Sequence, residues 1–172
     1  MILKRFFSKS SAPERTVYEA IVAAARHPVP FARWGVADDV DGRFDMISLH
    51  MFLILDRLKG EYPEFRQHLV DVFFMDMDRS LREMGVGDIS VGKKVRKMAE
   101  AFYGRVAAYD AGLAESRSAL MAALARNFFP EGNRTGAAGK LADYMLAARV
   151  RLASLAADYV TAGKIDFPEP QP

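Results

Sequence analysis

One segment has residue types and spacing typical of phosphate chemistry. Gly87 and Gly92 are separated by four residues, and Lys93 and Lys94 follow directly. A nucleotide-binding phosphate loop shares this spacing, but it also needs a preceding strand and a Ser or Thr after the lysine to bind magnesium. Here a helical pattern precedes the glycines, and Lys94 stands where the hydroxyl residue should be. The sequence therefore predicts no nucleotide site and favours a helix–helix turn, although a helix N-terminus with lysines could still attract a phosphate or carboxylate.

The same segment places four cations, Lys93, Lys94, Arg96 and Lys97, in the first turns of a predicted helix. Cations at a helix N-terminus oppose the helix dipole, at a cost of roughly 0.3–1 kcal/mol each at low salt. On a helical wheel that starts at Val91, these four side chains point away from the apolar stripe. Two interpretations remain open: a solvated surface, or a surface that meets anionic lipid headgroups, an acidic protein or RNA.

The other titratable residues lack the spacing of a metal or catalytic site. The chain has no cysteine, which excludes disulfides, thiolate zinc sites and a cysteine nucleophile. His27, His50 and His68 do not have the spacing of a helical metal pair, and the acids around Gly42 are out of register with a calcium loop. We expect His50, inside an apolar helix, to be a hydrogen-bonded core residue. We predict no catalytic residue, no metal and no cofactor.

Asp76 is expected to point inward, because it falls beside apolar residues of its helix. It would then need a donor, since an unpaired buried carboxylate is very costly. Arg43 or Arg105 could supply one, which predicts a structural ion pair and not a catalytic acid. The neighbouring charges are expected to form ordinary i,i+4 pairs, namely Asp78–Arg82 and Arg79–Glu83.

Periodicity near 3.6 residues dominates the chain, and no convincing strand pattern is present. This predicts an all-α fold, a single compact domain of about six helices. The second helix is apolar except for a narrow polar sector, so we expect it at the centre of the bundle. Gly85 is expected to end the third helix in a left-handed conformation. The first expected helix begins with a capping pattern at Ser11 and ends before Pro28, and the others cover roughly residues 43–59, 63–84, 90–110, 113–128 and 137–162.

Composition predicts one domain of ordinary size. The chain has 172 residues, and its net charge of +2 is too small to indicate nucleic acid by itself. Uninterrupted apolar runs such as Met51–Leu55 are far shorter than the ~20 residues that span a bilayer. We expect a helical domain over residues 11–165 and a disordered Pro-rich tail over 166–172. Before them lies a basic and apolar segment, residues 1–10, that either frays or contacts a membrane surface.

Three segments are long and unusual sequence motifs: YEAIVAAAR (Tyr18–Arg26), DGRFDMISLHMFLILDRL (Asp41–Leu58) and MDRSLREMGVGDISVGKKVRKMAEAFYGR (Met77–Arg105). They resemble the ubiquinol–cytochrome c chaperone family, the assembly factors for the respiratory ubiquinol–cytochrome c reductase. The resemblance covers roughly Tyr18–Ala125. It is specific, because these long motifs occur in the same order in the family. Mitochondrial relatives have longer N-terminal extensions, so the short N-terminus here suggests a bacterial member.

The resemblance implies an all-helical, non-enzymatic chaperone that binds newly made cytochrome b and holds it for haem insertion and assembly. It implies a cytoplasmic protein, peripheral at the inner membrane, that could also meet anionic lipids or the ribosome but takes no DNA and no small-molecule substrate. The alternative is a helical RNA- or ribosome-binding adaptor that uses the basic face at Lys93–Lys97. The residues expected to bind a partner are Arg43, Asp45 and His50 from the second segment, and Arg79, Arg82, Glu83, Lys93, Lys94, Arg96, Tyr103 and Arg105 from the third.

Overall fold

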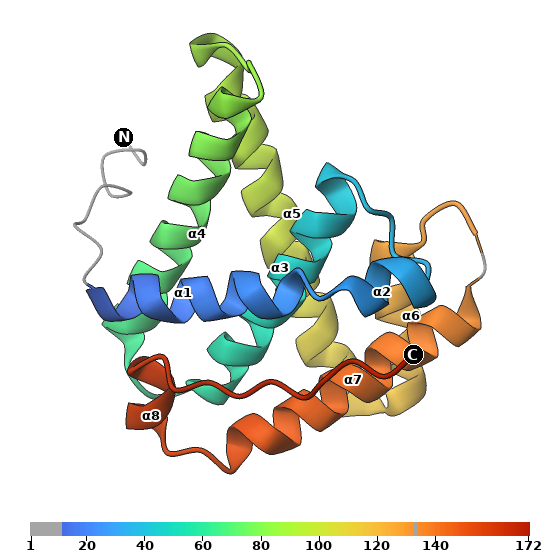
Figure 1. The fold of residues 1–172 in the computed structure, drawn as a ribbon. Coiled ribbons are helices and arrows are strands. Elements are labelled where there is room, and N and C mark those ends of the chain that lie inside the picture. Colours follow the sequence, from blue (N-terminus) through green and yellow to red (C-terminus); the bar gives the residue numbers. More distant parts are fainter. Residues whose placement is uncertain (1–11, 133) are drawn as a thin grey trace.

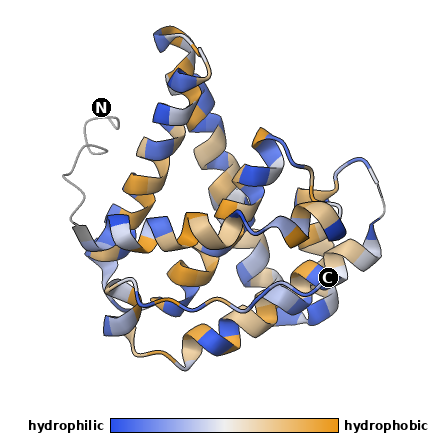
Figure 2. Ribbon diagram, viewed as in Figure 1, coloured by the Kyte–Doolittle hydropathy of each residue, from blue (hydrophilic) through white to orange (hydrophobic). Residues whose placement is uncertain are grey.

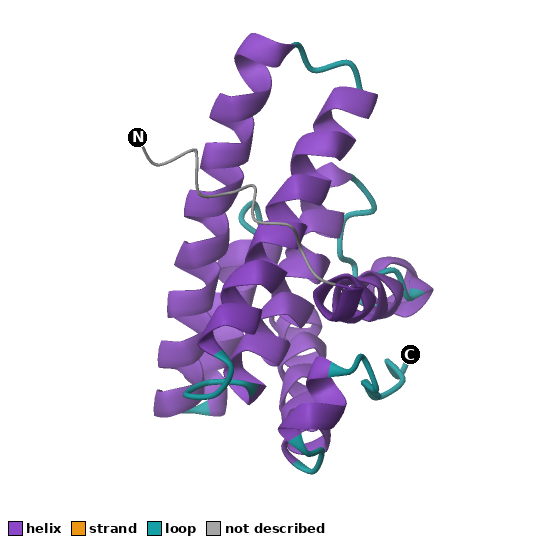
Figure 3. Cartoon of the chain, turned by 90° about the vertical axis from the view of Figure 1, so that its left-hand side faces the viewer, coloured by secondary structure: helices purple, strands orange, loops and turns teal. Residues whose placement is uncertain are grey.

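The computed structural model describes residues 12–132 and 134–172, and every regular element in these ranges is a helix (Figure 3). The expected all-α fold is therefore confirmed. No helix in the described ranges is both long and apolar enough to cross a membrane. The basic segment 1–10 and Ser11, the start of the expected capping pattern, lie outside the described residues. The helices are α1 (Ala12–Ala25), α2 (Pro28–Arg33), α3 (Val40–Arg57), α4 (Pro63–Glu83), α5 (Asp88–Glu115), α6 (Arg117–Phe128), α7 (Thr135–Ala153) and α8 (Ala157–Thr161).

Helix boundaries differ from the expected ones at three places. The expected loop after α1 contains the short helix α2, which is capped because the N–H of Val29 donates to His27 Nδ1 (3.3 Å). Helix α5 continues past Asp110, and α6 begins where Ser116 Oγ accepts from the N–H of Ala119 (3.1 Å). The last expected helix is divided into α7 and α8. Local polar contacts of this kind move a boundary by a few residues without changing the periodic pattern.

Helix α3 lies at the centre of the bundle, as expected, and contacts α1, α5, α6 and α7 (Figure 1). Every residue from Phe44 to Leu55 is buried. The polar sector of this helix is buried as well, since Asp45 and Ser48 are 5% and 1% exposed. A buried polar group costs free energy unless it is paired. The surrounding helices supply partners for two of the buried polar side chains of α3, Asp45 and His50.

An ion pair between Asp45 and Arg105 joins α3 to α5. The Arg105 Nη2 atom lies 2.6 Å from Asp45 Oδ1. The same guanidinium lies over the ring of Phe44, with Cζ 5.4 Å from the centroid, and donates through Nη1 to the carbonyl of Ala101 (3.1 Å). Burial raises the pKa of Asp45 to about 7, and Arg105 limits the rise. The carboxyl group is therefore partly protonated near neutral pH.

A hydrogen-bonded histidine joins α3 to α7, which confirms the core role expected for His50. Its Nδ1 lies 2.8 Å from the carbonyl oxygen of Met46, and its Nε2 lies 2.7 Å from the hydroxyl of Tyr144. Because a carbonyl can only accept, Nδ1 carries the proton and Nε2 accepts from Tyr144. Burial lowers the pKa of His50 to about 4. A second contact between the same helices, Arg149 Nε to Asp56 Oδ2 (2.7 Å), lies nearer the surface.

Helices α4 and α5 form a hairpin whose far end projects beyond the rest of the bundle (Figure 1). Gly85 has φ +86°, so it ends α4 in the left-handed conformation expected for it. Helix α5 begins at Asp88, which places Gly92 and Lys93 inside a helix. These residues cannot form the open loop that a phosphate-binding motif requires. The projecting end is a mixture of polar and apolar residues (Figure 2).

The C-terminal residues 165–172 form an extended strap that returns from α8 along α7 (Figure 1). The ring of Phe167 meets His50 edge to face, with centroids 4.9 Å apart. The indole N–H of Trp34 donates to the carbonyl of Gln171 (2.8 Å). The structure thus differs from the expected disordered tail, because an aromatic side chain and a backbone carbonyl of the strap find partners in the bundle.

We predict that the contribution of Asp45 to the free energy of unfolding falls as pH rises from about 4 to about 7. The folded protein keeps the proton up to the raised pKa of about 7, whereas the unfolded chain loses it near 3.8. The fall is at most about 4 kcal/mol, at ~1.4 kcal/mol per pKa unit. Urea unfolding of the wild type and of Asp45→Asn at several pH values measures it.

The difference between these two proteins isolates Asp45, because His50 is present in both. His50 contributes with the opposite sign: its pKa is lowered to about 4, so its contribution is lost as pH falls below about 6.5. A difference between wild type and Asp45→Asn that stays constant across this pH range would contradict the prediction.

We also predict that deletion of residues 167–172 exposes Trp34, the single tryptophan of the chain. The indole loses its hydrogen bond to Gln171, and the packing of Phe167 on His50 is lost. The emission maximum should move to longer wavelength, and the free energy of unfolding should fall by about 2 kcal/mol. The helical circular dichroism signal should persist, since the strap contains no helix. An unchanged emission maximum and an unchanged melting temperature would show that the strap is not docked.

Candidate functional site

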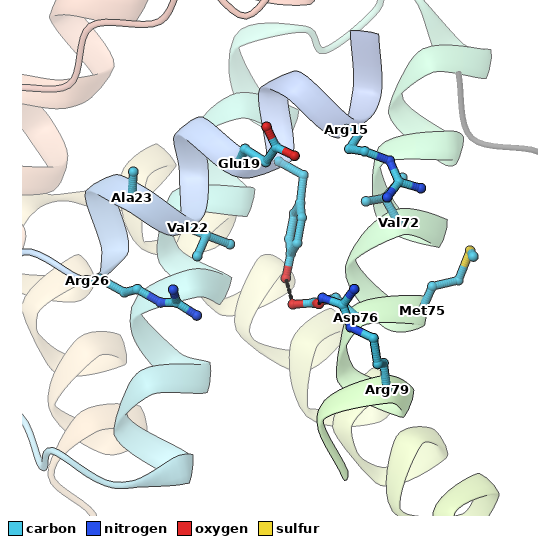
Figure 4. Close-up of a pocket in the computed structure, with 10 residues that line it drawn as sticks. Arg15, Glu19, Val22, Ala23, Arg26, Val72, Met75, Asp76 and Arg79 are labelled. Carbon is cyan, nitrogen blue, oxygen red and sulfur yellow. Dashed lines mark hydrogen bonds and ion pairs between the residues drawn. The ribbon is translucent and has the colours of Figure 1, made fainter. Parts of the chain in front are cut away.

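A groove of about 570 Å³ opens between α1 and α4 (Figure 4). Its apolar part comes from Val22 and Val72, with Met75 at the edge, where that side chain is 38% exposed. Its polar part comes from both helices. The lining residues are Arg15, Tyr18, Glu19, Val22, Ala23 and Arg26 of α1, and Val72, Met75, Asp76 and Arg79 of α4.

Helical spacing explains why these side chains share one groove. On α1 the residues at 15, 19, 22 and 26 follow an i, i+4, i+7, i+11 pattern, which places them on one side of a helix. On α4 the residues at 72, 75, 76 and 79 follow the corresponding i, i+3, i+4, i+7 pattern. The two faces meet because Val17, Ile21 and Leu69, on adjoining positions of the same helices, are fully buried.

A hydrogen-bonded carboxylate joins the two sides of the groove. The hydroxyl of Tyr18 donates to Asp76 Oδ2 (2.9 Å), and Arg79 pairs with Asp76 Oδ1. Burial and the neighbouring Asp76 carboxylate raise the pKa of Tyr18, so its hydroxyl stays protonated and keeps donating. The expectation that Asp76 has a structural ion pair is confirmed. The expected donors, Arg43 and Arg105, are wrong: Arg79 is one turn away on the same helix and Tyr18 comes from α1.

The groove has an excess of positive charge beside its apolar residues. Arg15, Arg26 and Arg79 face two carboxylates, Glu19 and Asp76, and Asp76 is already paired. Such a surface suits an apolar segment that carries an acidic group. Within residues 12–132 and 134–172, no group of three or more His, Cys, Asp or Glu side chains could hold a metal ion.

Three of the predicted partner-binding residues, Arg79, Arg82 and Glu83, continue from the groove along α4 toward the end of the hairpin. Arg79 Nε lies 3.8 Å from Glu83 Oε1, and Arg82 Nε lies 2.5 Å from Asp78 Oδ1. Both i,i+4 pairs expected from the sequence are therefore confirmed. All three predicted residues are exposed or nearly so, and they can be reached by a partner.

The predicted residues of α5 are also on the surface. Lys93, Lys94 and Arg96 are exposed near the N-terminus of this helix, as the helical wheel predicts. Tyr103 is half-exposed, and its ring packs beside Phe102 with centroids 5.4 Å apart. These residues lie on the α4–α5 hairpin, as do Arg79, Arg82 and Glu83, which form a row along α4.

The remaining predicted residues do not share this surface. Arg43 is exposed at the start of α3, where its Nε lies 2.8 Å from Asp38 Oδ1. The other three are engaged inside the bundle: Asp45 of α3 pairs with Arg105 of α5, and His50 of α3 binds Tyr144 of α7. In this conformation Asp45 and His50 are buried and Arg105 is partly buried, and their contacts hold α3 in place.

The sequence analysis missed the α1 side of the groove, Arg15, Tyr18 and Arg26. A usable signal was present, because the charged residues of α1 recur at helical spacing beside the apolar stripe. The spacing does not show which helix packs against these residues of α1. The nearness of Tyr18 to Asp76, which are 58 residues apart, comes from the packing of α1 on α4.

Comparisons with known proteins give one consistent answer. The chain matches the ubiquinol-cytochrome C chaperone family over residues 32–167. It is 27% identical over 100 residues to ubiquinol-cytochrome-c reductase complex assembly factor 1 of Xenopus laevis, which is 56% of this chain and 50% of that protein. The matched region thus spans about half the length of this curated relative.

A solved structure is similar over nearly the whole chain. The crystal structure of the Cbp3 homolog from Brucella abortus has a TM-score of 0.83 and 43% sequence identity, covering 98% of this chain and 97% of that one. The family match reaches α7 and the strap, well beyond the region up to residue 125 where the sequence resemblance was noted. Because this match covers far more than half of its length, the chain belongs to the ubiquinol-cytochrome C chaperone family.

Proposed function

We propose that this protein is an assembly chaperone for the ubiquinol–cytochrome c reductase that binds newly made cytochrome b and holds it for haem insertion. The observation that carries the proposal is the family match over residues 32–167. It is supported by the similarity to a relative named as an assembly factor of this reductase and to a Cbp3 homolog. The proposed client, cytochrome b, is what the family resemblance implies.

The groove between α1 and α4 is the surface we propose for the client. It offers apolar contact at Val22, Val72 and Met75, next to the cations Arg15 and Arg26. A client segment with apolar residues and an acidic side chain would bury the first against the groove and pair the second with an arginine. The row Arg79, Arg82 and Glu83 would extend this contact along α4.

This mode of action requires no catalysis, because holding a client needs contact area and charge and no reacting group. We therefore propose a non-enzymatic role. We also propose that the protein works at the cytoplasmic face of the inner membrane as a peripheral protein, since cytochrome b is a subunit of a membrane complex. The projecting hairpin, with its exposed cations, is the feature that supports this location.

Deleting the gene should lower the amount of assembled ubiquinol–cytochrome c reductase and leave unrelated membrane complexes intact. The reason is that cytochrome b without its chaperone would not receive haem or assemble. Optical spectra of isolated membranes and native gels measure both effects. A normal level of spectroscopically intact cytochrome b in the deletion strain would count decisively against the proposal.

Charge reversal in the groove, Arg15→Glu/Arg26→Glu, should lower the recovery of cytochrome b with the tagged protein from solubilised membranes. Loss of two attractive contacts and gain of repulsion should weaken binding about tenfold or more. Both side chains are exposed, so the melting temperature should change little.

The matched control for this experiment is Arg126→Glu/Lys140→Glu, which makes the same charge change at exposed sites on α6 and α7. It should retain wild-type recovery of cytochrome b. Equal recovery with the groove variant, the control and the wild type would remove the groove as the client site.

A further inference from the structure

The tip of the α4–α5 hairpin, residues 84–97, presents two aliphatic side chains to solvent. Ile89 is 89% exposed and Met84 is 54% exposed. The hairpin does not need them to close, because Leu81 and Val91 are the residues buried between its helices at this end. The tip projects away from the rest of the bundle (Figure 1), so no other helix covers it. These two residues are therefore available to an external surface.

Four cations lie beside these aliphatic residues: Lys93, Lys94, Arg96 and Lys97 are all exposed. None of them forms an ion pair with a residue in the described ranges of the chain. Four acids toward this end of the hairpin are paired with arginines of α4 instead, namely Asp76 and Glu83 with Arg79, and Asp78 and Asp88 with Arg82. The tip thus carries unneutralised positive charge at a helix N-terminus, where the helix dipole has the same sign.

Helical geometry aligns the apolar residue with the cations. Ile89, Lys93 and Arg96 follow the i, i+4, i+7 pattern, so they lie on one side of α5. At ~1.5 Å per residue, Lys93 lies about 6 Å and Arg96 about 10 Å behind Ile89 along the helix axis. Interfacial segments bury their apolar side chains about 5–10 Å deep, with cations at the level of the headgroups. The order of residues along α5 fits that depth profile.

We infer that the hairpin tip docks on an anionic lipid surface, with Met84 and Ile89 at the boundary between headgroups and acyl chains and the four cations on the lipid phosphates. The inference names the membrane contact of the proposed peripheral chaperone and rests on that function. Docked in this way, the hairpin stands on the membrane, and the row on α4 leads from the lipid surface to the groove.

Lipid fits this tip better than RNA or an acidic protein does. Single-stranded RNA is held by cations combined with aromatic side chains on which bases stack. The aromatic residue on this side of α5, Tyr103, is about 21 Å from Ile89 along the axis, and Ile89 and Met84 cannot stack on bases. A protein partner would need a concave site to cover a convex tip, whereas a lipid surface deforms around it.

Sedimentation of the full-length protein with phosphatidylcholine vesicles, with and without phosphatidylglycerol, tests the inference. The wild type should bind only the vesicles that contain phosphatidylglycerol, and more weakly as salt is added. Lys93→Glu/Arg96→Glu should weaken this binding roughly 25-fold or more, because each cation lost weakens it about fivefold. Ile89→Ser should weaken it about tenfold.

Matched controls exist for both variants. Arg126→Glu/Lys140→Glu makes the same charge change away from the tip, and Val150→Ser removes an exposed aliphatic side chain of α7. Both should bind vesicles like the wild type. All variants should keep the wild-type melting temperature. The N-terminal segment 1–10 is present in every variant, so a difference between them reports on the tip alone.

Three outcomes overturn the inference: no binding of wild type to phosphatidylglycerol vesicles, equal binding by tip variants and controls, or loss of RNA binding by the tip variants with vesicle binding intact. The last would assign the tip to nucleic acid. Failure of the inference is separable from failure of the proposed function. Recovery of cytochrome b from detergent-solubilised membranes needs no lipid surface, so it tests the client site independently of the tip.

Discussion

The structure depends on the burial of one helix, α3, along most of its length. Its residues from Phe44 to Leu55 are all inside the bundle, including a carboxylate and an imidazole. Each of these groups must find a partner on another helix, because a buried polar group left unpaired is costly. Asp45 finds Arg105 on α5, and His50 finds Tyr144 on α7. Each of these contacts requires one particular side chain at one particular position, which apolar packing does not. The two contacts therefore fix which sides of α5 and α7 face the centre.

Because α3 contacts α5 through Arg105, near the middle of that helix, the N-terminal end of α5 is not needed to cover the core. It can pair with the end of α4 and project from the bundle (Figure 1). The strap acts at the opposite end of the molecule, where Phe167 covers His50 and Gln171 binds Trp34. The core is thus covered without the hairpin tip, so the tip is available to contact a partner or a surface.

The charges also differ between the body of the hairpin and its tip. Asp76, Asp78, Glu83 and Asp88 are paired with Arg79 or Arg82, whereas the cations of the tip have no such partners in the described part of the chain. In the arrangement we propose, three surfaces lie in series: the tip on lipid, the row along α4, and the groove against α1. A client leaving the membrane would meet them in that order. Arg79 belongs to both the row and the groove, and so connects the last two.

The sequence by itself determined the all-α fold, the central place of α3 and the surface position of the tip cations, because these follow from the local periodicity of apolar residues. It also determined the family. Only the tertiary structure decided the contact of Tyr18 with Asp76, the docking of the strap and the α1 side of the groove, since each joins residues far apart in the chain. Gly112 shows the reason: it resembles a helix break, yet α5 continues through it. A Cβ there would lie 2.8 Å from Leu120 Cα, a closeness that depends on how α6 packs and not on local pattern.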